Sequence, residues 1–324
     1  MGRLRRDRRT PNTGVVHVTN RVIEGLPFVS REFMEYVLLS VMARAQEKYP
    51  VQLCAFVWMG NHYHIIIAGT LNLVSPFMNY VNGEVAKYIK RFCPEKYQSR
   101  VWEPGSYNEE RLATAEDVIK KMVYIYSNPS NAGLVNSIED YTGFSSWNMF
   151  KADSYVLEGT WTRPKYAKRV PRYMTARQDR DMLLHLKRHA ECSHQLRIMP
   201  YVWKNYFTET KNRSTEELFE EITSRLQLKE HETAAGRGYK CLGATKLKRA
   251  CIWRKFAPVK RGRTPFLSCH DNELRKELIA SYREFCRQCR EAWNAWKHGY
   301  LDVPFPRGAF RPPMGAVKLW VIGA

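Results

Sequence analysis

Two histidines one residue apart, His62 and His64, are the side chains of this sequence whose types and spacing could most directly do chemistry. They follow an apolar run over residues 53–59 and the turn pair Gly60-Asn61, and they open a second apolar run. This pattern predicts two strands joined by a tight turn. Because side chains alternate along a strand, both imidazoles lie on one face, where they can bind one metal ion. The pair alone is also compatible with two polar side chains on an ordinary sheet face.

A tyrosine and an asparagine form a second candidate pair at the end of a helix predicted over residues 114–127. Thr114 and Asp117 have the spacing of a capping box at the start of this helix, and Pro129 is expected to stop it. Tyr124 and Asn128 are four residues apart and therefore share one helix face. A tyrosine hydroxyl is a nucleophile and an amide oxygen is a metal ligand, so both suit a place beside the histidines. The alternative is a core tyrosine and an asparagine that caps the helix.

Taken together and in this order, these features resemble the single-tyrosine transposases of the HUH superfamily, and most of all the REP-associated tyrosine transposases. The resemblance covers roughly residues 10–150. Its supporting segments are His17-Val-Thr-Asn-Arg21, Asn61-His-Tyr-His64, Tyr124 to Val135 and Tyr141 to Trp147. One departure is Gly60, where the family usually has proline, and another is the long continuation to residue 324.

The resemblance implies the HUH nuclease fold and a metal-dependent activity on DNA. The implied reaction cleaves and rejoins single-stranded hairpin DNA, such as a REP hairpin, through a 5′-phosphotyrosine bond. Tyr124 is the expected nucleophile, with Tyr126 as the reserve candidate. Neutral imidazoles and an amide oxygen make a mixed set of ligands that Mg²⁺ or Mn²⁺ can use. The expected ligands are His62, His64 and Asn128.

The resemblance also bears on DNA contacts and on assembly. In the family, polar residues after the first strand lie near the DNA, which makes Asn20 and Arg21 candidates for that role. REP-associated relatives are generally held to be monomers, so a monomer is expected, with a dimer as the alternative.

Two other functions remain open at this point. One is a DNA-binding protein that recognises a hairpin and does not cut it. The other is a metal-dependent phosphoesterase in which water is the nucleophile. The presence of both histidines, Tyr124 and Asn128 favours the transposase over the pure binder, because a degenerate copy would be expected to lose at least one of them.

The elements that must position these residues follow from hydrophobic periodicity. Strands are predicted over residues 15–19, 51–59, 62–68 and 101–107, and helices over residues 30–49, 75–92 and 114–127. The order βαββαβ followed by a helix predicts a ferredoxin-like α+β domain over residues 13–150, with an antiparallel sheet and helices on one face. The helix over residues 75–92 carries four polar side chains that could track a nucleic-acid strand: Asn82, Lys87, Lys90 and Arg91.

Charge indicates the kind of partner. The net charge is +20, and residues 1–150 carry 17 Lys and Arg against 14 Asp and Glu, whereas the remainder carries 35 against 18. A surplus of this size predicts a polyanionic partner such as nucleic acid. The sequence contains no apolar run long enough to span a membrane, its N-terminal residues do not have the pattern of a signal peptide, and its eight cysteines lack framework spacing. We therefore expect a cytoplasmic, nucleoid-associated protein with reduced thiols.

Beyond residue 150 the sequence pattern changes. We predict a basic arm over residues 1–12, a linker over residues 151–175 and a basic, mainly helical accessory domain over residues 176–324 that binds DNA. Its helices are predicted over residues 176–194, 214–231 and 272–298, and in its basic and aromatic stretch Arg254 and Lys255 are candidate DNA contacts. Cys286-x-x-Cys289, with Cys269 and His270, could suggest zinc, but a three-residue spacing within a helix is also what packing alone produces.

Overall fold

A computed structural model describes residues 12–105, 107–150, 152, 154–256 and 265–309. The chain divides into two compact units, one made of residues 13–270 and the other of residues 1–12 and 271–324. Helix α7 (Asn272–Lys297) is the main described element of the second unit. All the candidate site residues belong to the first unit. The expected basic arm falls outside the described residues, except for Asn12.

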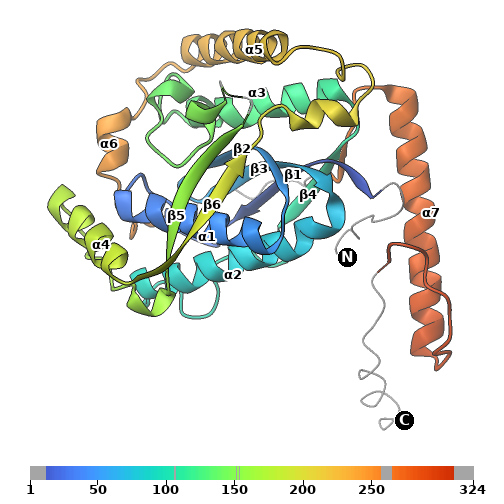
Figure 1. Ribbon diagram of the computed structural model, residues 1–324, viewed down its shortest axis with the longest axis horizontal. Helices are drawn as coiled ribbons and strands as arrows, with labels where there is room; N and C mark the ends of the chain where they lie inside the picture. The colour runs from blue at the N-terminus through green and yellow to red at the C-terminus, as the bar shows by residue number, and fades with distance from the viewer. Residues whose placement is uncertain (1–11, 106, 151, 153, 257–264, 310–324) are drawn as a thin grey trace. The chain divides into compact units, whose positions relative to one another are not determined.

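The centre of the first unit is a four-stranded antiparallel sheet in the order β4-β1-β3-β2. Its elements are β1 (Thr13–Arg21), α1 (Glu32–Lys48), β2 (Gln52–Trp58), β3 (His62–Thr70), α2 (Val74–Phe92) and β4 (Asn108–Leu112). This order is the ferredoxin-like arrangement that the sequence predicts. Figure 1 shows α1 and α2 together on one side of the sheet.

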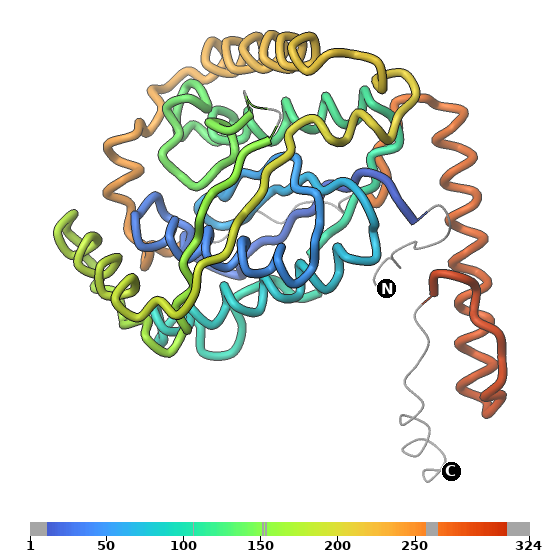
Figure 2. Tube along the Cα trace, viewed as in Figure 1, coloured from blue at the N-terminus to red at the C-terminus, as the bar shows by residue number. Residues whose placement is uncertain are grey.

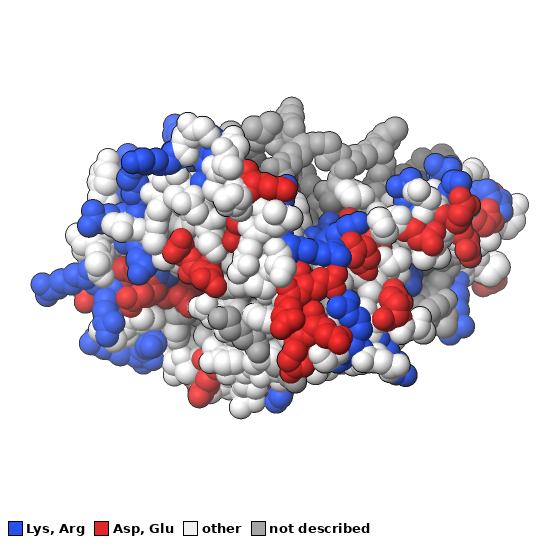
Figure 3. Space-filling view, turned by 90° about the horizontal axis from the view of Figure 1, so that it is seen from above, with Lys and Arg blue, Asp and Glu red and all other residues white. Residues whose placement is uncertain are grey.

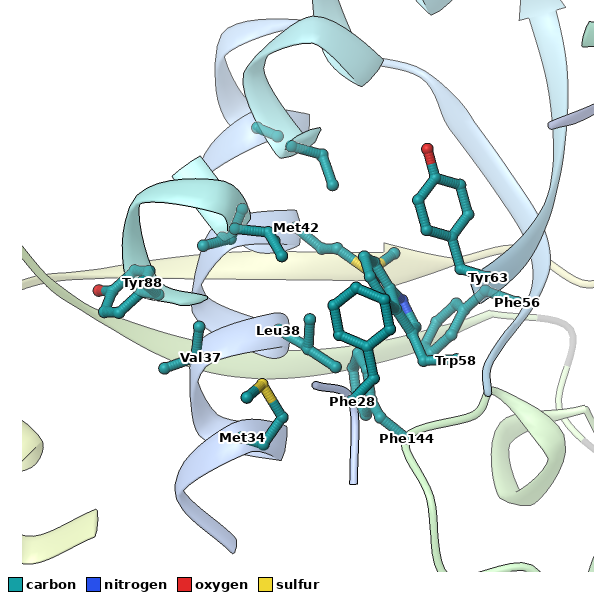
Figure 4. Close-up of a cluster of buried hydrophobic side chains, with 14 of the residues drawn as sticks. Phe28, Met34, Val37, Leu38, Met42, Phe56, Trp58, Tyr63, Tyr88 and Phe144 are labelled. Atoms are coloured by element: carbon teal, nitrogen blue, oxygen red, sulfur yellow. The ribbon is translucent and has the colours of Figure 1, made fainter. Parts of the chain in front are cut away.

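The layer between the sheet and helices α1 and α2 is apolar. Alternate residues of the central strands, among them Val18, Tyr63 and Ile65, point into it and are fully buried. The close-up in Figure 4 shows helix side chains such as Val37, Leu38 and Met42 gathered with Phe56 and Trp58 from β2. Burial of this apolar surface supplies the main driving force for folding the domain.

Helix α3 (Ala115–Asn131) covers the opposite face of the sheet together with α5 (Thr215–Gly236) (Figure 1). The predicted capping box is present, because Thr114 accepts from the Asp117 amide and Asp117 accepts from the Thr114 amide. Pro129 does not stop the helix, which continues to Asn131. A proline this close to the C-terminus removes only one hydrogen bond. The chain leaves the helix at Gly133, whose positive φ of 65° suits glycine.

Residues beyond 150 contribute further helices, as expected, and they also add strands to this sheet. Strands β5 (Tyr155–Thr162) and β6 (Ala190–Ile198) lie beside β2, β7 (Leu267–Ser268) lies beside β4, and the full order is β5-β6-β2-β3-β1-β4-β7. The β6–β2 and β4–β7 pairs are parallel, so the sheet is mixed. The remaining elements are α4 (Ala176–Arg188), α6 (Ala244–Lys248) and the short 3-10 helices η1 (Leu71–Leu73), η2 (Ile138–Asp140), η3 (Trp147–Met149), η4 (Pro164–Tyr166) and η5 (Val202–Tyr206).

Several sequence-based boundaries are corrected by these elements. The expected linker over residues 151–175 contains β5, and the helix predicted to residue 194 ends at Arg188 and gives way to β6. The strand predicted over residues 101–107 lies instead at Asn108–Leu112, and the first helix begins after Arg31 without a side-chain cap from Ser30. Strands β4 and β6 were missed because their sequences are mainly polar and show no apolar period. Figure 2 traces the chain through these segments.

No helix in the described parts of the chain is long and apolar enough to cross a membrane.

Candidate active site

Both candidate histidines lie on the sheet face that α3 covers. His62 begins β3 and is partly exposed, whereas His64 is 5% exposed, and their ring centroids are 5.0 Å apart. The turn helps to orient His62, because its Nδ1 lies 2.7 Å from the Asn61 amide oxygen, which can only accept. The Nδ1 of His62 therefore carries the proton, and in the neutral ring its Nε2 carries a lone pair.

A third histidine, His17 on β1, joins this pair, and the sequence analysis gave it no role of its own. Its Nε2 lies 2.9 Å from His64 Nδ1, and its Nδ1 lies 3.1 Å from an Oε2 of Glu110 on β4. Glu110 also accepts a hydrogen bond of 2.8 Å from Lys121 on α3. The network thus runs from β3 through β1 and β4 to the tyrosine helix. Strand alternation and pairing could have suggested it, because His17 and Glu110 are register partners.

Burial governs the protonation of this network. Desolvation lowers the pKa of His17, and it lowers the pKa of His64 well below the ordinary value, with further contributions from nearby His62, His17 and Lys121. Burial alone would raise the pKa of Glu110, but hydrogen bonds and charge from His17 and Lys121 hold it below the usual range. At neutral pH the network therefore consists of neutral imidazoles and an ionised Glu110–Lys121 pair.

Tyr124 lies over the histidines from α3. Its ring meets His64 edge to face, with centroids 5.4 Å apart, and meets His17 at 6.4 Å. Lys121, one helix turn earlier, places its Nζ 5.3 Å from the centre of the same ring. Tyr124 is 38% exposed, so a ligand in solution can reach it. The structure thus brings the expected nucleophile and the expected ligand His64 together.

Asn128 and Tyr126 have different surroundings. The Nδ2 of Asn128 donates to the Tyr124 carbonyl at 2.9 Å, which leaves Oδ1 as the atom that could bind a cation. Tyr126 is fully buried, and its hydroxyl lies 2.9 Å from the Ser146 hydroxyl. Burial also raises the pKa of Tyr126. The reserve candidate is therefore part of the core and does not face solvent.

Asn20 and Arg21, the candidate DNA contacts at the end of β1, lie on opposite faces of the sheet because side chains alternate along a strand. Arg21 is the register partner of His62 and shares its face. Asn20 is the partner of Tyr63, is 6% exposed and accepts from the Arg21 amide, so it points toward the opposite face. Only Arg21 of these two lies on the side of the histidines.

The four polar residues of α2 also lie away from the histidines, because α2 packs on the opposite face of the sheet. Asn82 accepts from the Tyr63 hydroxyl, Lys87 pairs with Glu84, and Lys90 donates to the Ser99 carbonyl. Arg91 is exposed. A DNA strand that contacted these side chains would follow a different surface from the one beside Tyr124.

Arg254 and Lys255 are exposed in the loop that precedes residue 257. This loop contacts the segment after β1, because the Phe256 carbonyl accepts from the Gly25 amide and the Arg254 carbonyl accepts from Lys96. The same segment contacts the turn before His62, through a hydrogen bond from the Val22 amide to the Asn61 carbonyl. These basic residues thus belong to the end of the sheet where β3 begins.

The donor set fits a hard or borderline divalent cation. The Nε2 of His64 is buried and has no hydrogen-bond partner among the described residues. A buried polar atom in this state is costly unless a ligand satisfies it. The other two expected ligands are His62, whose ring lies beside that of His64, and Asn128, one turn after Tyr124 on α3. Within the described ranges, no three His, Cys, Asp or Glu side chains form a metal site, and Cys286 and Cys289 lie inside α7.

Helix α3 is held in place by a segment that we call the brace, residues 209–243. Glu209 accepts from the Ala115 amide at the start of α3, and Arg225 binds both carboxylate oxygens of Glu116. At the other end, Arg237 donates to the Ser130 carbonyl at 2.8 Å. The amides of Leu242 and Gly243 donate to the carbonyls of residues 133 and 134. Both ends of the tyrosine helix are therefore tied to this later part of the chain.

One stretch of this domain matches a known family model. Residues 14–128 match the family model described as "Transposase IS200 like", a stretch that runs from β1 to Asn128. This part of the chain is therefore similar to that transposase family, in agreement with the resemblance seen in the sequence. No curated protein matches the chain. Among solved structures, it is similar to one described as "Structure of the REP associates tyrosine transposase bound to a REP hairpin", with 17% identity and a TM-score of 0.35 over 47% of this chain and 86% of that one.

Proposed function

We propose that this protein is a transposase that cleaves and rejoins single-stranded hairpin DNA, with Tyr124 as the covalent nucleophile. The observation that carries the proposal is the contact between the exposed Tyr124 and His64, whose Nε2 is buried and has no partner among the described residues. The family match covers both residues. Arg21 and the basic loop with Arg254 lie at the same end of the sheet and offer positive charge to the backbone of a DNA strand.

A Mg²⁺ or Mn²⁺ ion would be held by His62, His64 and Asn128. When bound, such an ion stabilises negative charge on a scissile phosphate. The protein's own contribution is to orient these ligands: Asn61 directs His62, His17 directs His64, and the Tyr124 carbonyl directs Asn128.

In the proposed reaction the Tyr124 hydroxyl oxygen attacks the phosphorus of a DNA phosphodiester. A bond forms between that oxygen and phosphorus, and the bond from phosphorus to the 3′-oxygen breaks. The tyrosine loses its proton and the departing 3′-oxygen gains one, so protons balance. The 5′-phosphotyrosine bond conserves the energy of the phosphodiester, so a free 3′-hydroxyl can reverse the step and join strands.

The test is a matched pair of substitutions on one helix. Full-length protein is incubated with an end-labelled single-stranded DNA hairpin and Mn²⁺, and the products are separated on a denaturing gel. Wild type is expected to give a labelled protein band that maps to the Tyr124 peptide. Tyr124→Phe should give no adduct while it still binds the hairpin, because only one oxygen is removed. Tyr126→Phe removes the same atom two residues later and should retain the adduct.

The other candidate functions predict different gels. Free cleaved DNA without an adduct, from both wild type and Tyr124→Phe, would identify a phosphoesterase that uses water. Tight hairpin binding without cleavage by wild type under either metal would identify a non-cleaving DNA-binding protein.

A further inference from the structure

We propose that Glu110 and His17 are positioning residues that set the tautomer of His64, so that its Nε2 presents a lone pair to a divalent cation. This inference rests on the proposed function, because it concerns one of the proposed ligands. It goes beyond that function in giving a role to two buried side chains, Glu110 and His17, that are neither proposed ligands nor the proposed nucleophile.

The direction of these hydrogen bonds follows from the carboxylate of Glu110, which lies at one end of the series. An ionised carboxylate can only accept hydrogen bonds, and Glu110 receives one from Lys121 at 2.8 Å. Its contact with His17 Nδ1 at 3.1 Å therefore requires the proton on Nδ1. A neutral imidazole carries one N–H, so the Nε2 of His17 must accept.

The same reasoning applies at the next contact. The Nε2 of His17 lies 2.9 Å from His64 Nδ1, so His64 must donate from Nδ1. Its single proton is then used, and Nε2 carries the lone pair. This nitrogen is the buried atom without a partner among the described residues, and it is the nitrogen through which a cation would be bound.

The opposite arrangement is unfavourable in this environment. A proton on His64 Nε2 would require His17 to donate from Nε2, and the lone pair on His17 Nδ1 would then face the Glu110 carboxylate. His17 and Glu110 are each 3% exposed, so water cannot relieve that repulsion. A doubly protonated His17 would avoid that repulsion, but it would place a second positive charge beside Lys121, which donates to the same Glu110 oxygen.

The same hydrogen bonds connect the tyrosine helix α3 to the strands that carry the histidines. Lys121 lies on α3 three residues before Tyr124, and Glu110 binds Lys121 and His17 through the same oxygen. The helix that carries the tyrosine is thereby joined to the strand that carries the proposed ligand.

The first measurement is made on the full-length protein without metal. Long-range ¹H–¹⁵N correlations of ¹⁵N-histidine distinguish the two neutral tautomers, and the His64 signals are assigned by their loss in His64→Gln. The expected result is a proton on Nδ1 in both His17 and His64. A proton on His64 Nε2 in wild type would overturn the proposal, whatever the protein does to DNA.

The second measurement interrupts the series of hydrogen bonds from Lys121 to His64 without leaving a buried charge. In the double variant Glu110→Met with Lys121→Met, two apolar side chains of similar length replace the ion pair, a change that proteins often tolerate. The tautomer bias should be lost, and the dissociation constant for Mn²⁺ should rise by about 10- to 100-fold, as for other residues that support metal ligands. Lys276→Met with Glu273→Met, an exposed pair on α7, is the matched control and should leave the constant unchanged.

The outcomes separate this inference from the proposed function. An unchanged tautomer and an unchanged Mn²⁺ constant in a folded double variant would overturn the positioning role and leave the transposase intact. If wild type binds no Mn²⁺, the proposed metal site fails, and the proposal that a cation receives this lone pair fails with it. If the double variant does not fold, the wild-type tautomers alone decide.

Discussion

The two parts of the proposed site are held in different ways. The histidines lie on β3, which is hydrogen-bonded on both edges, to β1 and to β2, so the backbone ladder itself sets their positions. Tyr124 lies on a helix packed against the surface of the sheet, and side chains and amides of the brace hold both ends of that helix.

This difference shows that the chain beyond the family match contributes to the architecture of the site. Residues 14–128 contain the strands, the histidines and Tyr124, but every residue of the brace lies after them. The sequence analysis assigned residues 176–324 to DNA binding, and that assignment remains a prediction. Within the same stretch, the brace supports α3. The face of the molecule seen in Figure 3 carries acidic as well as basic side chains, so it is not a uniformly basic surface.

The largest effect on activity is expected from removing the two histidines that β3 carries. The double substitution His62→Ala with His64→Ala should lower strand cleavage by about 10²–10³-fold or more, because it removes the proposed electrostatic stabilisation of the phosphate. Hairpin affinity, measured by fluorescence anisotropy, should be largely retained. EDTA should have the same effect on wild type.

The matched control uses two other histidines one turn apart, His185→Ala with His189→Ala, at the end of α4. This variant should cleave at the wild-type rate. Full cleavage by wild type in EDTA would contradict the metal-dependent mechanism.

A smaller effect on activity is expected from removing contacts that hold the tyrosine helix α3. Arg225→Ala with Arg237→Ala removes contacts at both ends of α3. The free energy of unfolding should fall by about 1–3 kcal/mol, mainly because the Ser130 carbonyl loses its charged donor. Amide hydrogen exchange in α3 should accelerate and adduct formation should slow, while the Mn²⁺ dissociation constant should rise less, because two of the three proposed ligands, His62 and His64, lie on β3 and only Asn128 lies on α3.

Arg287→Ala is the control for this variant, since Arg287 pairs with Glu284 and Glu291 of its own helix. A change in Mn²⁺ affinity equal to the change in adduct formation would mean that the two parts are not held independently.

The smallest effect is expected from removing positive charge that lies on neither β3 nor α3. Arg254→Gln with Lys255→Gln should weaken binding of single-stranded DNA without altering the chemical step. The slope of log K against log salt should become shallower by about 0.7 for each phosphate that the variant no longer neutralises. Lys87→Gln with Lys90→Gln, on the opposite face of the sheet, should change the slope less. The reverse ranking would place the DNA along α2.

The sequence predicted the central fold well because local signals agree there. Apolar alternation marks β1, an apolar run marks β3, and the capping box marks the start of α3, so βαββαβ and the relation between His62 and His64 follow directly. Strand β4 was misplaced because its sequence, Asn-Glu-Glu-Arg-Leu, is almost entirely polar. One of those polar residues, Glu110, belongs to the histidine network.

Long-range pairing accounts for the other omissions. His17 and Glu110 are 93 residues apart in sequence, and only their register across β1 and β4 brings them together. Strand β6 is mostly exposed and polar, so its sequence shows no apolar face that would distinguish it from a continuation of α4. The brace was predicted as a helix, but nothing in the periodicity of α5 specifies that it packs on α3.

The strands added to the two edges of the four-stranded core have a further consequence, for self-association. An unpaired outer strand is a template on which another chain can add a strand. In the four-stranded core, β2 and β4 would be such strands, but β6 lies beside the first and β7 beside the second. The antiparallel pair of β5 and β6 can lie beside β2 because Gly159 lets β5 approach α1 closely: a Cβ at that position would lie 3.1 Å from the Cα of Ser40. At Leu53 of β2, and at Arg111 and Leu112 of β4, a second copy would therefore find the strand edge already paired within the same chain.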